Sequence, residues 1–187
     1  IRSKPLQHPG IFAEMGVGDG LQNNTLNLLM HGWSGMWFGG EDIAFNLSES
    51  DSLFFKKSWI TLDSIDEIYL DNVLEHLDKP MRVMEELHRI TKLGGKIKII
   101  VPYFRSKWAF IDPTHKTFYT VDSFAYYDPD HIICQRYDYV TTRFQVKKIV
   151  FNETLINGWI KKIIINIANK YPHYYETYFS HLFPLDD

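Results

Sequence analysis

An acidic residue stands directly before three alternating glycines near the start of the chain, in the stretch EMGVGDG. These residues are Glu14, Gly16, Gly18 and Gly20. Glycine reaches positive φ and lets backbone N–H groups approach a ligand without a Cβ in the way. A dinucleotide-binding turn reads G-x-G-x-x-G, whereas Leu21 stands where its last glycine belongs. The stretch predicts a ligand loop and disfavours a pyrophosphate; a tight turn without a ligand is the alternative.

Two acids frame this loop and indicate the charge of its ligand. Glu14 directs an anion at the loop, which suits a cationic or hydroxyl-rich ligand better than a phosphate. About twenty residues beyond the loop, Glu41 and Asp42 end an expected second strand, where a carboxylate can accept hydrogen bonds from ribose hydroxyls. This arrangement favours a nucleoside that carries a positive charge and no phosphate.

Alternating strands and helices have to position these acids. We expect strands within 10–15, 34–42, 65–76 and 96–102, and helices within 21–32 and 79–95. In the second helix Pro80 lies in the first turn, and Gly94 and Gly95 are expected to close it. Such alternation predicts an α/β fold with a Rossmann-like, mainly parallel sheet flanked by helices. In such sheets the ligand binds outside the carboxyl ends of the strands.

The chain changes character after Pro102. An aromatic-rich loop is expected to about residue 138, then a strand or antiparallel hairpin at 139–151, then C-terminal helices. In the first of these helices one face carries Ile156, Trp159, Ile160, Ile163, Ile164 and Ile167. We expect that face to cover a sheet or a neighbouring subunit, with a membrane surface as the alternative. No membrane span is expected, because two lysines interrupt the apolar run.

Composition limits the remaining classes of function. The 187 residues, 45% of them hydrophobic, suit one domain, with residues 11–102 as a ligand-binding core and 103–187 on the substrate side. A net charge of −3 argues against nucleic acid as a partner. The single Cys134 suits a reducing compartment, and we expect the cytoplasm. The histidines lack the spacing of metal ligands on one element, so no metal is expected.

The same residues resemble a known family. EMGVGDG is similar to the first motif of class I S-adenosylmethionine-dependent methyltransferases, and GGED stands where their ribose acid does. Residues 64–104 resemble the type 11 branch, through VLEHL, ELHRI, K-x-GG and the strand that ends in Val-Pro. AFIDPTHKTFYTVDSFAYYDP resembles a bacterial and archaeal subgroup for which modification of surface polysaccharides or small molecules is suspected. The early part, about residues 18–41, looks closer to FkbM-type methyltransferases.

The resemblance implies S-adenosyl-L-methionine as cofactor and S-adenosyl-L-homocysteine as product. It places Glu14, the three glycines and Glu41 at the cofactor. Asp71 and Asn72, just past the end of the third strand, are expected to flank the methionine or adenosine part, and a solvated strand end is the alternative. His76 is a candidate for catalysis or for holding the loop after the third strand, and the structural role is slightly favoured.

The acceptor side is expected just past Pro102. His115 is the candidate base, because a histidine can take a hydroxyl proton near neutral pH. Tyr103, Asp112 and Lys116 are candidates for substrate binding, with Lys116 able to anchor a phosphate or carboxylate. A turn built by Pro113 and Asx-type hydrogen bonds is the alternative for this segment.

We therefore expect methyl transfer to a small molecule or glycan precursor, at oxygen rather than nitrogen. A non-catalytic binding module on the same fold is the first alternative. An NAD-dependent nucleotide-sugar oxidoreductase is the second, and the missing late glycine and the lack of a Tyr-x-x-x-Lys pair argue against it. The family often ends on a further strand that we do not find after Pro184, and because an unpaired edge invites pairing, a homodimer is also expected.

Overall fold

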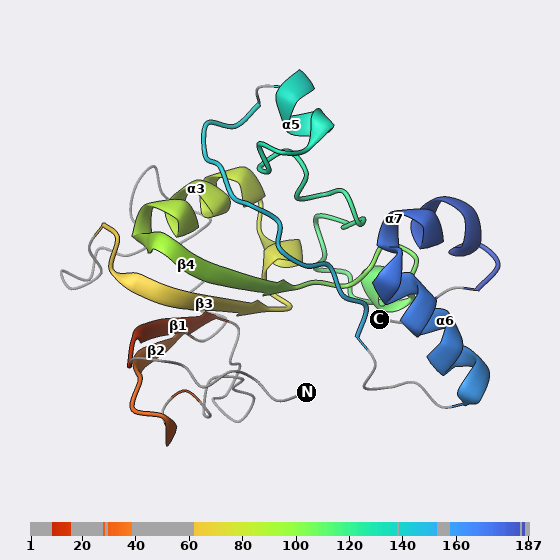
Figure 1. Ribbon diagram of the computed structural model, residues 1–187, viewed down its shortest axis with the longest axis horizontal. Helices are drawn as coiled ribbons and strands as arrows, with labels where there is room; N and C mark the ends of the chain where they lie inside the picture. The colour runs from red at the N-terminus through yellow and green to blue at the C-terminus, as the bar shows by residue number, and fades with distance from the viewer. Residues whose placement is uncertain are drawn as a thin grey trace. The chain divides into compact units, whose positions relative to one another are not determined.

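The computed structural model shows two compact units, with the boundary between Val101 and Pro102 (Figure 1). The residues that the structure describes are 9–15, 28, 30–38, 62–137, 139–152, 158–183 and 185. The side chains of 36–38 lie outside this description.

The first unit contains a four-stranded parallel sheet in the order β2-β1-β3-β4. The strands are β1 (Ile11–Met15), β2 (Ser34–Phe38), β3 (Ile65–Asp71) and β4 (Thr91–Ile100). The expected α/β class and all four expected strands are therefore confirmed. Gly32, which was expected to end the first helix, has φ of +82° just before β2, but most of that helix lies outside the described residues.

Helix α3 (Pro80–Ile90) lies over β4 on one face of this sheet (Figure 1). It begins with Pro80, whose missing N–H would have no partner in a first turn. Its apolar stripe recurs at helical spacing and is buried, with Val83, Met84, Leu87 and Ile90 nearly inaccessible. The helix and the sheet thus form the core of the first unit.

The expected end of this helix was wrong. The helix ends at Ile90 rather than at Gly94 and Gly95, which belong to β4. The hydroxyl group of Thr91 donates to the carbonyl of Leu87 at 2.6 Å and closes the last turn. The chain then joins the sheet through an irregular register opposite Ile65 to Glu67. A Cβ on Gly95 would lie 2.6 Å from the Thr91 methyl carbon, so this close approach requires glycine.

Short helices and extended segments make up the second unit. Its helical elements are α4 (Trp108–Ile111), α5 (Ile132–Arg136), α6 (Trp159–Lys170), α7 (Pro172–Tyr174) and η2 (Tyr175–Phe179). Its core gathers Tyr103, Val121, Phe151, Ile165, Ala168, Tyr175 and Leu185. The ring of Phe151 contacts those of Tyr103 and Tyr175 edge to face, at 5.0 and 5.2 Å between centroids.

The strand expected at 139–151 was wrong: the described residues of that segment form no ladder. Its backbone N–H groups find unrelated partners instead. Phe144 donates to the Tyr127 carbonyl, Val146 to the Asp128 carboxylate and Phe151 to the Asn169 side chain. Alternating side chains made the segment extended, but no neighbouring strand pairs with it in the described part of the chain.

Helix α6 was expected, but the face expected to be covered is exposed. Its buried residues are Ile165 and Ala168, whereas Trp159, Ile160, Ile163 and Ile167 are about half exposed or more. None of the helices among the described residues is both long enough and apolar enough to cross a membrane.

Candidate functional site

The carboxyl ends of the four parallel strands lie at one edge of the sheet. The register pairs Met15 with Phe38 and with Leu70, and Asp71 with Ile100. β1 ends at Met15, which pairs with Leu70 near the end of β3, and the glycine stretch follows directly in the sequence. Gly16, Gly18, Gly20 and Glu41 themselves lie outside the described residues.

Glu14 lies near the end of β1 at this edge and is buried, with 1% of its surface exposed. The register places it between Trp37 on β2 and Tyr69 on β3. Burying a carboxylate is costly unless it is paired or hydrogen-bonded. This residue is the described part of the predicted cofactor loop.

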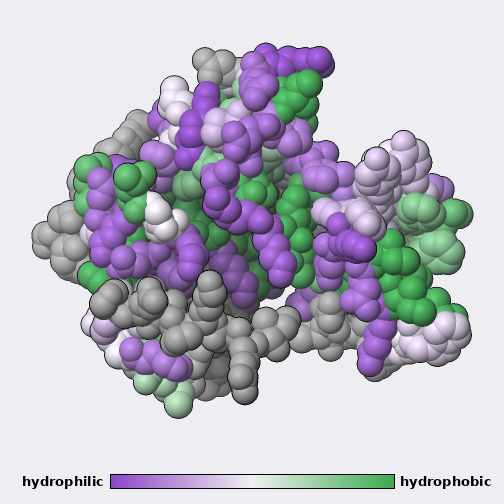
Figure 2. All heavy atoms as spheres, in the orientation of Figure 1, coloured by the Kyte–Doolittle hydropathy of each residue, from purple (hydrophilic) through white to green (hydrophobic). Residues whose placement is uncertain are grey.

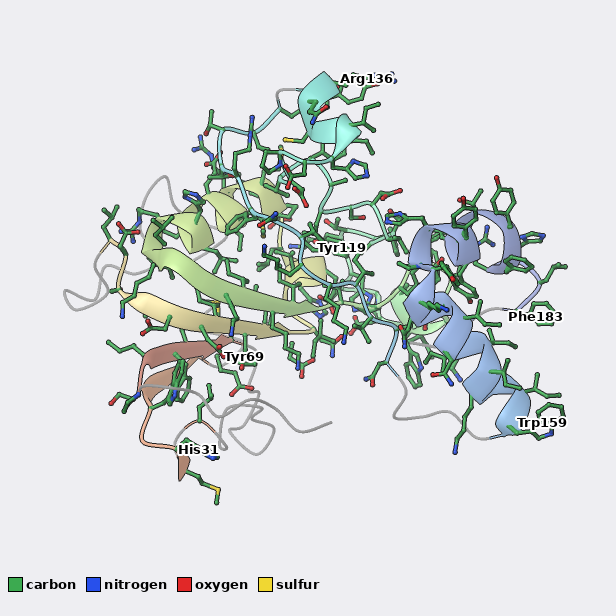
Figure 3. The ribbon with its side chains drawn as sticks, in the orientation of Figure 1. His31, Tyr69, Tyr119, Arg136, Trp159 and Phe183 are labelled. Atoms are coloured by element: carbon green, nitrogen blue, oxygen red, sulfur yellow. The ribbon has the colours of Figure 1, made fainter. Side chains whose placement is uncertain are left out.

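The pKa of Tyr69, the neighbour of Glu14 on β3, depends on the charges on this face of the sheet (Figure 3). Burial raises the pKa of the Tyr69 phenol, and the nearby carboxylates of Glu67 and Glu14 raise it further. The phenol donates to Glu67 at 2.8 Å, and Lys96 approaches the same carboxylate at 3.2 Å from an exposed position. Two acids therefore lie near Tyr69, while Lys96 pairs with Glu67 and the ammonium group of Lys98 lies 5.8 Å from the centre of the Tyr69 ring.

Asp71 and Asn72 follow at the end of β3, as expected. Asn72 has φ of +51°, in a left-handed region that asparagine tolerates better than most residues. Its N–H donates to the Ile100 carbonyl at 3.0 Å, and its side-chain amide donates to Asp71 at 2.9 Å. The two hydrogen bonds hold an exposed amide and a carboxylate at the strand end, where a ligand on the sheet edge would meet them.

A short 3-10 helix, η1 (Leu74–His76), continues from β3. His76 is half-buried at its end. The residue before it, Glu75, is almost fully buried, and the sequence analysis did not single it out. The only signal for it was its place between two apolar positions in VLEHL.

The predicted acceptor residues belong to the second unit. Asp112 accepts hydrogen bonds from the Thr114 N–H at 2.8 Å and from the Thr114 hydroxyl at 2.6 Å. These bonds make the Asx-type turn that was the alternative for this segment. The turn also fixes the direction in which the chain enters His115 and the exposed Lys116.

A backbone carbonyl holds the ring of His115, and the side chain is 7% exposed. Its Nδ1 lies 3.0 Å from the Ala109 carbonyl, and because a carbonyl only accepts, this nitrogen carries the proton. The neutral ring then has its lone pair on Nε2, which lies 4.0 Å from the Asp112 carboxylate. This tautomer is the one a base acting through Nε2 requires.

The aromatic residues around this turn divide into two groups. Tyr103 and Tyr119 are buried and bridge each other through the backbone. Burial raises the pKa of the Tyr103 phenol, and the Glu176 carboxylate adds to the effect. The rings of Phe110 and Phe118 instead stack at 4.8 Å in exposed positions. Tyr103 is thus a core residue, and the exposed pair offers an apolar surface next to His115 in the chain.

Two solved structures show a distant likeness to this chain. A chain of the complex between the Haloferax volcanii Trm112 methyltransferase activator and a protein described as a methyltransferase is 22% identical, with a TM-score of 0.37. That match covers 53% of this chain, which spans only 47% of the other. A SAM dependent methyltransferase from Archaeoglobus fulgidus is 16% identical, with a TM-score of 0.43, and the match covers 89% of this chain and 80% of that one. No protein-family model and no curated protein matches the chain.

Proposed function

We propose that this protein is an S-adenosylmethionine-dependent methyltransferase. The observation that carries the proposal is Glu14, a buried carboxylate at the end of β1 that directly precedes three alternating glycines. Asp71 and Asn72 stand at the same edge of the sheet. An acid, a bare loop and a second polar strand end suit a cationic nucleoside.

The residues present fit this cofactor. The carboxylate of Glu14, buried beside Tyr69, would favour a positive charge near the end of β1. We assign Glu14 and the N–H groups of Gly16, Gly18 and Gly20 to the cofactor loop, and Glu41 to the ribose hydroxyls. Asp71 and Asn72 are assigned to the adenosine or methionine part. When bound, the cofactor supplies a methyl group on a positively charged sulfur.

The protein's own task is then to position the acceptor in line with that methyl group. Correct positioning alone is able to contribute about 7–11 kcal/mol to the lowering of a barrier. A base is needed only where the acceptor loses a proton, as a hydroxyl does. We assign that role to Nε2 of His115, whose tautomer is set by the Ala109 carbonyl. His76 is assigned to holding the chain after β3 rather than to the chemistry.

The acceptor in this proposal is a small molecule or glycan precursor that is methylated at oxygen. Lys116 would anchor an acidic group of the acceptor, and the exposed Phe110 and Phe118 would contact its apolar part. Asp112 acts through its turn and orients His115. The buried, helical position of the free Cys134 is compatible with action in the cytoplasm.

Calorimetric titration with S-adenosylhomocysteine tests the proposal, with NAD as the competing ligand. We expect S-adenosylhomocysteine to bind and NAD not to bind. The variants Glu14→Gln and Glu41→Ala should each bind about tenfold more weakly, because each removes a hydrogen bond to a charged group. The matched control is Glu85→Gln on α3, which replaces an acid paired with Arg82 and should bind normally.

Three results would lead elsewhere. Binding of NAD alone would favour the oxidoreductase. Binding of neither ligand by folded protein would make the glycine stretch a plain turn. Binding of S-adenosylhomocysteine without turnover of any acceptor hydroxyl, when acceptors are screened with labelled S-adenosylmethionine, would favour the binding module.

A further inference from the structure

Three tyrosine rings stack on one another at the surface of the second unit. The ring centroids of Tyr137 and Tyr139 lie 5.5 Å apart, and the centroid of Tyr126 lies 6.2 Å from that of Tyr137 and 5.7 Å from that of Tyr139. Tyr139 and Tyr137 are 67% and 39% exposed, whereas Tyr126 is partly buried. We call these three residues the tyrosine cluster. None of them belongs to the cofactor or acceptor residues assigned above.

The backbone beside the tyrosine cluster is held in place. At the end of α5 the Tyr137 N–H donates to the Ile133 carbonyl at 2.9 Å. Val140, directly after Tyr139, is buried, and its carbonyl accepts a hydrogen bond from the Arg143 guanidinium group. A tyrosine on a fixed backbone has few torsions left to lose, so covering its ring with a ligand costs little conformational entropy.

The hydroxyl groups of the tyrosine cluster are available to a ligand. None of the three forms a hydrogen bond with any residue that the structure describes. By contrast, the hydroxyl group of the buried Tyr175 donates to the Phe183 carbonyl at 2.7 Å. A phenol both donates and accepts, so each ring combines an apolar face with a polar group at its tip. The cluster therefore suits a ligand that has an apolar face bordered by hydroxyl groups.

The charges near the tyrosine cluster argue against an anionic ligand. Residues 126–139 contain three aspartates and one arginine, Arg136. The carboxylates of Asp128 and Asp130 accept hydrogen bonds from neutral donors, a backbone N–H and a side-chain amide. Figure 2 shows that hydrophilic residues predominate around α5, and Figure 3 shows Arg136 at the end of this helix. A segment with net negative charge disfavours phosphate groups, and with them nucleic acid and anionic lipids.

The angles between the rings argue against a cage for an ammonium group. The plane of Tyr139 makes angles of 24° and 22° with the planes of Tyr126 and Tyr137. An aromatic cage instead encloses its cation between ring faces that meet at steep angles. Rings that are nearly parallel offer flat surfaces, on which one side of another ring can lie.

We propose that the tyrosine cluster binds an uncharged saccharide, with a pyranose ring lying on the face of Tyr139. One side of a pyranose ring carries C–H groups that pack on an aromatic face, and the hydroxyl groups at its edge donate to and accept from phenol groups. The lack of charge on such a ligand agrees with the negative charge of the segment. The inference does not require methyl transfer, although a saccharide agrees with a glycan precursor as the acceptor.

Binding to immobilised oligosaccharides tests this inference. The full chain is applied to a panel of neutral oligosaccharides of glucose, galactose, mannose and N-acetylglucosamine, and the dissociation constant of the best ligand is measured by calorimetry. We expect binding. Tyr139→Ala should weaken it about tenfold or more, because the variant loses the most exposed ring of the cluster together with its hydroxyl group. Tyr139→Phe keeps the ring and should weaken binding only about threefold.

The matched control is Tyr174→Ala. Tyr174 is 65% exposed and its ring lies 6.1 Å from that of Tyr178, but this pair belongs to α7 and η2, and the variant should bind as the natural protein does. Circular dichroism establishes that each variant is folded. The inference is wrong if the natural protein binds no member of the panel, or if Tyr139→Ala binds unchanged. It is also wrong if Tyr174→Ala loses as much affinity as Tyr139→Ala.

Failure of this inference is distinguishable from failure of the proposed function. Tyr139→Ala should bind S-adenosylhomocysteine as the natural protein does. Natural protein that binds S-adenosylhomocysteine but no saccharide would contradict the saccharide site alone. Natural protein that binds a saccharide but not S-adenosylhomocysteine would contradict the methyltransferase alone.

Discussion

Different interactions stabilise each of the two units of this chain. In the first, backbone groups pair with each other along four parallel strands, and helix α3 packs against them. In the second, the side chains of Asp128, Asn169 and Glu176 each accept hydrogen bonds from backbone N–H groups of segments without a strand ladder. A ladder shares its stability over many equivalent bonds, whereas each attachment of the second kind depends on one side chain. Single substitutions should therefore have local effects in the second unit and broad effects in the first.

The largest effect is expected for Leu87→Ala, in the core between α3 and the sheet. Leu87 is completely buried, so the change should lower the free energy of unfolding of the first unit by about 2–5 kcal/mol. Amide exchange of β3 and β4 should speed up together. The control Met81→Ala, on the exposed side of the same helix, should cost less than about 0.5 kcal/mol. Faster exchange in only one of the two strands would contradict a shared ladder.

A smaller loss is expected for Gly35→Ala in β2. A Cβ at this position would lie 2.2 Å from ring carbons of the buried Phe12, so the ring has to move. We expect a loss of about 1–3 kcal/mol in urea unfolding. At Gly94 an added Cβ would have no atom within 4 Å. Gly94→Ala should therefore cost only the strain of an alanine in the left-handed region, about 1 kcal/mol. Equal losses would mean that β2 and Phe12 do not pack as described.

Asp128→Ala tests the second unit. The Asp128 carboxylate accepts from the N–H groups of Val146 at 2.8 Å and Asp130 at 3.0 Å. Its removal should cost about 1–2 kcal/mol locally and speed exchange of the Val146 amide about tenfold or more. Exchange of the β3 amides should stay as it was. An equal increase of amide exchange in both units would contradict the distinction between a unit stabilised by a strand ladder and one stabilised by individual side chains.

The smallest effect concerns Asp66 at the amino end of β3. Partial burial alone would raise its pKa, but hydrogen bonds from Lys92 and from the Ile11 N–H lower the pKa below the ordinary 3.8. Because the folded state prefers the ionised form of Asp66, the ionised carboxylate contributes its full stabilisation of the fold well above pH 3.8. This stabilisation is lost as the pH falls below that value. At about 0.5 kcal/mol for an exposed pair, it should appear as extra acid sensitivity that Asp66→Asn lacks. Identical acid titrations of the two proteins would contradict it.

The same contrast decides what could be predicted from the sequence. In the first unit, short apolar segments that alternate with helical patterns indicated all four strands, because a parallel sheet demands buried apolar segments. The end of α3 was missed since Thr91, not a glycine, closes the last turn. In the second unit, the segment 139–151 has the composition of a strand, but composition does not reveal whether a partner strand exists.

The residues of the candidate site could also be predicted better in the first unit than in the second. Glu14, Asp71 and Asn72 could be placed because strand ends are readable in an α/β pattern. The tautomer of His115 and the burial of Tyr103 depend on contacts that only the fold creates. The periodicity of α6 likewise gave its apolar stripe, whereas packing through Ile165 and Ala168 decided that the stripe faces outward.

The most direct test of the cofactor site is hydrogen exchange of the full chain with and without S-adenosylhomocysteine. We predict slower exchange at the carboxyl ends of β1 and β3, around Met15 and Asn72, and no change at 62–66, at the opposite edge of the sheet. Binding that protects other segments and leaves these strand ends unchanged would contradict the site, and so would the absence of any protection in folded protein.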